Sequence, residues 1–201
     1  MMRHTSKWSI QDIITTVLMS VLLIVIQFMI NMICQVNNFL SMVLSTGLNM
    51  MLCGPVYCVM IGRIRKPMVS FIYLTMVGFV FFLTGNWYVL PYLMTVGLIS
   101  EIILWRYDIF QHPWKIVLSW TVISLLYHGV NLLPIWFFWD TFSRFAMKSG
   151  MEREYVDAYV RYYTEPHWLI FILVFTVICG LTGAMLGIRL TRKHFVKSGV
   201  L

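Results

Sequence analysis

Six long apolar runs, separated by polar stretches, make up most of this chain. A membrane-spanning helix needs about 20 mainly apolar residues, and most of the runs come close to that length. The pattern predicts spanning helices over residues 13–33, 39–61, 68–84, 87–105, 116–139 and 168–190. The third run is short, so its helix should cross with little tilt. We therefore expect an all-α polytopic membrane protein, folded as one six-helix domain over residues 1–201.

One connection, from Asp140 to His167, is much longer than the others. Apolar and aromatic residues recur there at helical spacing on both sides of Ser149-Gly150, which predicts two amphipathic helices. The residues concerned are Phe138, Phe142 and Phe145 before the break, and Met151, Tyr155, Tyr159 and Tyr162 after it. Pro166 should end the second helix. Such helices lie either on the membrane surface or across the mouth of the bundle. We favour the mouth, because a loop this long is often a lid.

The basic residues indicate how the chain is oriented in the membrane. Eleven of the 15 Lys and Arg residues fall in four segments: the N-terminus, residues 62–67, residues 106–115 and the C-terminus. The other four lie in the long connection, where five acids balance them. By the positive-inside rule, this alternation predicts a multi-pass protein of the cell membrane with both termini in the cytoplasm. Residues 34–38, 85–86 and 140–167 should then lie outside.

Composition excludes several classes of protein. The chain is 60% hydrophobic and 11% charged, whereas soluble domains carry about 25% charged residues. The net charge of +7 does not indicate nucleic-acid binding, because the basic residues flank apolar runs, where lipid headgroups or a cytoplasmic partner would meet them. The four cysteines show neither a CxxC pair nor zinc-ligand spacing. The first apolar run is long enough to span, so we expect it to remain in place rather than be cleaved as a signal.

Glu101 is the only acid within a predicted span. Polar groups at such positions are costly and usually have a role. Arg106 follows just over one helical turn later, so we favour a structural salt bridge between the two over a proton relay.

The fifth predicted helix carries Tyr127, His128 and Asn131 near its middle, followed by Pro134. His128 and Asn131 share a helix face, and the proline frees a backbone carbonyl near residue 130. These groups either hydrogen-bond between helices or contact a ligand, and for His128 both interpretations remain open.

Amide side chains gather at the expected outer ends of the first two helices: Asn31, Gln35, Asn37, Asn38 and Asn49. With the rings nearby, they predict an outward-facing polar and aromatic site beneath the lid, as a solute would need. The candidate substrate-binding residues are Asn86, Trp87, Tyr127, His128, Asn131, Trp136, Trp139 and Tyr159. The three tryptophans also fit an aromatic belt at the membrane interface.

Small residues occur at close-packing spacing in two helices: Thr16 and Ser20 in the first, and Gly180, Gly183, Ala184 and Gly187 in the sixth. For the sixth helix we expect packing within the chain. The sequence contains no HExxH, GxSxG or Walker A motif and no paired intramembrane acids. We therefore expect no catalytic residue, no metal site and no enzymatic activity.

Several segments together resemble a known family: residues 52–57 (LCGPVY) leading to 65–67 (RKP), 82–87 (FLTGNW), and 183–187 (GAMLG) closing on 192–195 (RKHF). With six predicted helices and a long loop before the last, the chain looks like a substrate-binding S component of an energy-coupling factor (ECF) transporter. It is most similar to the MptD-type group, also called Trep_Strep. The resemblance covers nearly the whole chain.

The resemblance implies that the chain captures a micronutrient from outside and delivers it by docking on a transmembrane T component with two ATPases. The chain would need no cofactor of its own, because ATP is used by the partner subunits. In that family a small-residue pattern on the first helix meets the T component, which points to Thr16 and Ser20 here. The substrate would be a thiamin- or pterin-like heterocycle, or haem with His128, Tyr127 or a methionine as axial ligand. The alternative is a self-sufficient proton-coupled secondary transporter that uses Glu101, and a membrane enzyme ranks third.

Overall fold

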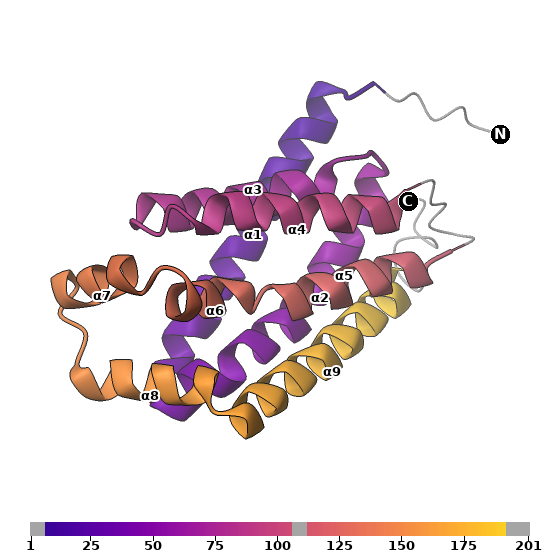
Figure 1. Cartoon of the computed structure of the whole chain (residues 1–201). Coiled ribbons are helices and arrows are strands. Elements are labelled where there is room, and N and C mark those ends of the chain that lie inside the picture. Colours follow the sequence, from indigo (N-terminus) through magenta and orange to yellow (C-terminus); the bar gives the residue numbers. More distant parts are fainter. Residues whose placement is uncertain (1–6, 106–111, 192–201) are drawn as a thin grey trace.

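The computed structural model describes residues 7–105 and 112–191. Within these ranges every regular element is helical (Figure 1). The α-helices are α1 Ile10–Cys34, α2 Ser45–Ile64, α3 Val69–Leu83, α4 Val89–Leu104, α5 Trp114–Leu126, α6 Gly129–Trp136, α7 Trp139–Lys148, α8 Arg153–Thr164 and α9 Pro166–Leu190. A π-helical turn, η1 (Leu40–Leu44), leads directly into α2. Arg3, Arg106 and the basic residues after Thr191 lie outside the described ranges.

Four helical stretches in the described ranges are long and apolar enough to cross a membrane: Ile10–Cys34, Leu40–Ile64, Trp114–Trp136 and Pro166–Leu190. Helices α3 and α4 are apolar but have only 15 and 16 residues. At about 1.5 Å per residue they measure roughly 22–24 Å, less than the ~30 Å hydrocarbon core of a bilayer. The all-α fold is confirmed, while the crossing of α3 and α4 stays a prediction.

Glycines allow α2 and α9 to pack closely. A Cβ atom on Gly54 would lie 2.5 Å from the backbone carbonyl carbon of Gly183, and one on Gly183 would lie 2.4 Å from the carbonyl oxygen of Met51. A side chain at either position would push the two backbones apart. The small-residue pattern of α9 therefore serves packing within the chain, as predicted.

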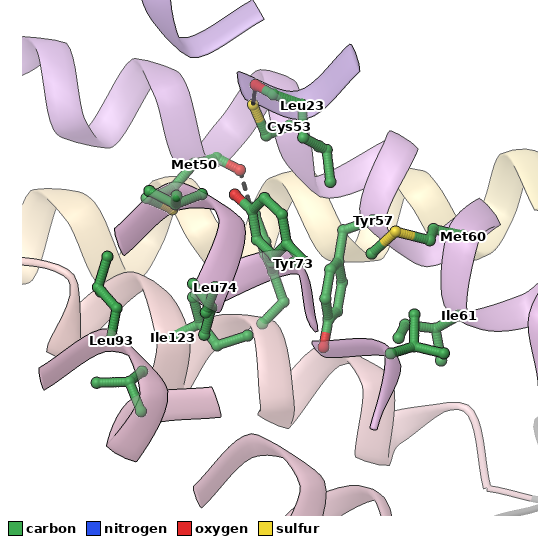
Figure 2. Packing of buried hydrophobic residues seen from close by; sticks show 14 of the residues in the cluster. Leu23, Met50, Cys53, Tyr57, Met60, Ile61, Tyr73, Leu74, Leu93 and Ile123 are labelled. Carbon is green, nitrogen blue, oxygen red and sulfur yellow. Dashed lines mark hydrogen bonds between the residues drawn. The ribbon is translucent and has the colours of Figure 1, made fainter. Parts of the chain in front are cut away.

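The core of the bundle contains polar groups that are satisfied by other helices. The hydroxyl of Tyr57 hydrogen-bonds with Ser70 on α3 at 2.7 Å and with Ser119 on α5 at 2.9 Å. The indole N–H of Trp120 donates to the carbonyl of Met50 at 2.9 Å. Figure 2 shows Tyr57 and the neighbouring Tyr73 among apolar side chains of the core. Because buried polar groups need partners, these bonds fix how α2, α3 and α5 meet.

The fifth predicted helix, 116–139, is interrupted in the structure. Helix α5 ends at Leu126, α6 begins at Gly129, and the apolar stretch ends at Trp136 rather than at residue 139. The hydroxyl of Tyr92 donates to the carbonyl of Leu126 at 2.5 Å. A Cβ atom at position 129 would lie 2.1 Å from that hydroxyl. The interruption therefore occurs where Tyr92 of α4 takes the freed carbonyl and glycine leaves room for its ring.

The long connection forms α7 and α8, which Figure 1 draws together at one end of the bundle. The two helices are separated at Gly150, whose φ is +69°, a backbone conformation that favours glycine. Helix α8 ends at Thr164, and Pro166 occupies the first turn of α9. The predicted pair of amphipathic helices is therefore confirmed.

Candidate functional site

A cavity of about 220 Å³ lies between α8 and the ends of the helices beneath it. We call it the amide chamber, because four of its lining side chains are amides. Its lining consists of Asn31, Gln35, Ser41, Met42, Ser45, Thr46, Asn49, Phe81, Tyr127, Val130, Asn131, Tyr155, Tyr159 and Tyr163. These residues come from α1, η1, α2, α3, α6 and α8 and from the break before α6, so the chamber depends on the assembled fold.

A second cavity of about 180 Å³, which we call the aromatic chamber, adjoins the first. The two share Phe81, Val130, Asn131, Tyr155 and Tyr159. The aromatic chamber is also lined by Asn86, Tyr88, Val89, Pro134, Phe142, Phe145 and Met151. Together the chambers combine a concave surface, aromatic rings and hydrogen-bonding groups, which are features of small-molecule sites.

Helix α8 closes the amide chamber through two tyrosines. The hydroxyl of Tyr163 donates to the carbonyl of Met42 at 3.0 Å and accepts from the amide of Asn131 at 3.0 Å. The hydroxyl of Tyr159 donates to the carbonyl of Asn131. Burial raises the pKa of both hydroxyls well above their usual range, so they stay protonated and able to donate. Helix α8 is therefore attached to η1 and α6 above the amide chamber, and its role as a lid stays a prediction.

Asn49 on α2 is the most distinctive polar group of the amide chamber. It is 5% exposed, and its amide nitrogen donates to the side-chain oxygen of Asn31 at 2.8 Å. Its own side-chain oxygen is buried and has no hydrogen-bond partner in the described part of the chain. Because buried polar groups nearly always have partners, this oxygen, in a residue that lines the chamber, is the clearest candidate acceptor for a bound molecule.

The structure brings some of the sequence-predicted site residues together. Tyr127 lines the amide chamber, Asn86 lines the aromatic chamber, and Asn131 and Tyr159 line both. Four residues from three parts of the chain therefore line two adjoining cavities.

The other predicted residues lie elsewhere. Trp87, Trp136 and Trp139 are exposed and do not line either chamber. His128 is buried, and its Nε2 atom hydrogen-bonds with the hydroxyl of Thr176 on α9 at 2.8 Å. The described contact of His128 is thus interhelical, and its contact with a ligand stays a prediction.

Several lining residues were not among the candidates. Ser45 and Thr46 stand out as a polar pair within an apolar run, and Tyr155 belongs to the predicted stripe of α8. Those signals were available in the sequence. Phe81 gave none, because an apolar residue in an apolar helix does not reveal which neighbour it faces.

A larger groove of about 650 Å³ runs along the other side of α8. It is more open than the two chambers, and charged residues line it, among them Glu152, Asp157 and Arg161. It lies outside the lid, so we treat it as surface rather than as the candidate site.

Thr16 and Ser20, the expected partner contacts, are both 0% exposed. The hydroxyl of Thr16 donates to the carbonyl of Asp12 at 2.7 Å. The exposed face of α1 carries large apolar side chains instead, such as Val17, Leu18 and Val21. Contact between Thr16 or Ser20 and a partner subunit therefore stays a prediction, and in this conformation both side chains face the inside of the bundle.

Comparison with known proteins places the chain in a family. Residues 10–197 match the family model described as hypothetical bacterial integral membrane protein (Trep_Strep). The chain belongs to the Trep_Strep family. No curated protein and no solved structure matches it. The family and the apolar helices together assign this Trep_Strep protein to the membrane.

In this Trep_Strep protein the amide chamber lies at one end of α1 and α2, and the basic residues of these two helices lie at the other end. Asn31 is near the end of α1, whereas Lys7 precedes its start. Asn49 is near the start of α2, whereas Arg63 is in its last turn. Lys66 lies beyond the end of α2, where its amine donates to the carbonyl of Lys7 at 2.9 Å. These basic residues are therefore distant from the amide chamber, whereas Arg153 and Arg161 lie on α8 beside it.

Proposed function

We propose that this Trep_Strep protein is the substrate-binding S component of an ATP-driven ECF importer. The observation that carries the proposal is a cavity of about 220 Å³, lined by amides and aromatic rings, within an integral membrane protein. Such a cavity suits reversible capture of a small molecule, because its amides and hydroxyls can orient a bound molecule and its rings can pack against it. The chain itself catalyses no reaction in this proposal, and ATP is hydrolysed by partner subunits.

The distribution of charge supports uptake from outside. The chambers lie at the ends of α1 and α3 and at the start of α2, away from Lys7, Arg63 and Lys66. The positive-inside rule puts the basic ends in the cytoplasm. With that orientation, both termini are cytoplasmic, the chambers open outwards and α8 is an external lid.

The hydrogen bonds of Glu101 support a binding subunit over a self-sufficient proton-coupled transporter. Its two carboxylate oxygens accept the backbone N–H groups of Met68 and Ser70 at 2.8 Å each. The carboxylate thus caps the start of α3, where the first N–H groups of a helix lack intrahelical partners. This structural role accounts for an acid in a predicted span without proton coupling.

Release of the solute requires α8 to move, because Tyr159 and Tyr163 close the amide chamber. Two points in the chain can absorb that movement. One is Gly150 with its positive φ, and the other is Glu165, which has an extended backbone between α8 and α9. In the proposal, docking on the T component favours the state in which α8 has moved away, and ATP hydrolysis resets the complex.

Co-purification tests the proposal. The tagged chain is expressed with the T component and ATPase pair of the same bacterium, and the complex is isolated in mild detergent. We expect all four subunits to elute together and the isolated chain to elute alone. Absence of a complex, combined with uptake by liposomes that contain this chain alone, would refute the proposal.

A further inference from the structure

The walls of both chambers are uncharged. Among the described residues that line them there is no Asp, Glu, Lys, Arg or His. A buried charge without a partner is strongly unfavourable, so a charged group on a ligand would not be compensated there. The chambers therefore select against ions.

Aromatic rings form flat walls around the aromatic chamber. The rings of Phe142 and Tyr159 stack at a centroid distance of 4.9 Å, and both residues line this chamber. Tyr88 also lines it and stacks on Phe138 at 4.5 Å, with an angle of 3° between the ring planes. Rings in the wall of a cavity can interact with another planar ring by stacking or by edge-to-face contact.

The amide chamber adds a requirement for hydrogen bonding. Within the described residues the side-chain oxygen of Asn49 accepts no hydrogen bond, while the amide nitrogen of the same residue donates to Asn31. Only a donor can satisfy this oxygen. A ligand that brings an N–H or O–H group to this point would remove the cost of an unpaired buried atom.

We infer that the two chambers bind an uncharged, planar heterocycle that donates an N–H group to Asn49 and stacks against the rings of the aromatic chamber. The inference rests on the proposed function and narrows its substrate class. A pterin-like ring meets these requirements. Thiamin carries a positive charge and haem carries two carboxylates, and the chambers offer neither ion a partner.

Binding to the purified chain in detergent at pH 7 tests the inference, with no other subunit present. The probes are pterin and lumichrome as uncharged rings, thiamin as a cation and iron protoporphyrin as a dicarboxylate. Isothermal titration measures the affinity of each. The variant is Asn49→Leu, and the matched control is Asn38→Leu, since Asn38 lies in the groove outside α8 and lines neither chamber.

We expect pterin or lumichrome to bind at least about tenfold more tightly than both charged probes. A charged group buried without a partner costs at least as much free energy as one unpaired buried polar group, which corresponds to about tenfold in affinity. Asn49→Leu should weaken that binding by about tenfold, and Asn38→Leu should leave it unchanged.

Failure of both uncharged rings to bind, tighter binding of a charged probe, or unchanged affinity in Asn49→Leu would overturn the inference. If Asn49→Leu does not fold, the affinities of the wild-type chain for the uncharged and charged probes still test the inference. Because no partner subunit is present, a negative result here leaves the co-purification test of the proposed function standing.

Discussion

Glu101 on α4 holds the start of α3 by accepting the backbone N–H of Met68 at 2.8 Å. Met68 has a φ of +72°, uncommon for a residue with a side chain, and has no side-chain cap of its own. The second oxygen of Glu101 accepts the N–H of Ser70. The first turn of a helix leaves N–H groups unpaired, and here a neighbouring helix supplies the acceptors. The only acid in a predicted span is therefore a structural group.

Glu101→Gln should destabilise the protein. The variant keeps one acceptor oxygen but replaces the other with an NH₂ group, which cannot accept an N–H. We expect the free energy of unfolding to fall by about 1 kcal/mol, the usual net contribution of one hydrogen bond, because the two N–H donors are exposed or only partly buried. Thermal unfolding in detergent measures the change, and Glu154→Gln on the exposed side of α8 is the control. Loss of uptake with unchanged stability would instead indicate proton coupling through Glu101.

Gly129→Ala should also destabilise the protein, because its Cβ would lie 2.1 Å from the hydroxyl of Tyr92. We expect a loss of about 1–3 kcal/mol, as for overpacked cores. A double-mutant cycle with Tyr92→Ala isolates the contact, since removing the ring should relieve most of the clash. Additive effects of the two substitutions would show that the break before α6 does not depend on Tyr92.

Tyr163→Phe should make the lid open more often. The substitution removes the hydrogen bond to Met42 and leaves the amide of Asn131 without this acceptor. A loss of about 1 kcal/mol corresponds to roughly a fivefold larger open population. Hydrogen exchange of the α8 backbone measures it, with Tyr162→Phe on the same helix as control. Equal exchange in both variants would mean that Tyr163 does not hold the lid.

The sequence predicted part of this site and missed the rest for physical reasons. Asn131 and Tyr127 were identifiable because polar groups are rare within apolar runs. The partner of His128, Thr176, lies 48 residues further along the chain, so the spacing of residues could not reveal it. Glu101 was expected to pair with Arg106, which lies outside the described residues, but its described partners are backbone N–H groups that a sequence pattern does not show.

The short helices α3 and α4 provide a test of topology. If both cross the membrane, Asn86 between them lies outside while Arg63 lies inside. We expect Asn86→Cys to react with a membrane-impermeant maleimide added to intact cells, and Arg63→Cys to react only after lysis. Background labelling should be low, because all four native cysteines are buried. Labelling of Asn86→Cys only after lysis would place this connection in the cytoplasm.

The most direct test of the central claim is uptake by proteoliposomes that enclose ATP. Vesicles containing this chain, the T component and the ATPase pair are compared with vesicles that lack the ATPases and with vesicles containing this chain alone. With a labelled form of the tightest-binding probe, we predict accumulation only in the complete, ATP-loaded vesicles. Equal accumulation by this chain alone, or none by the complete complex, would contradict the account.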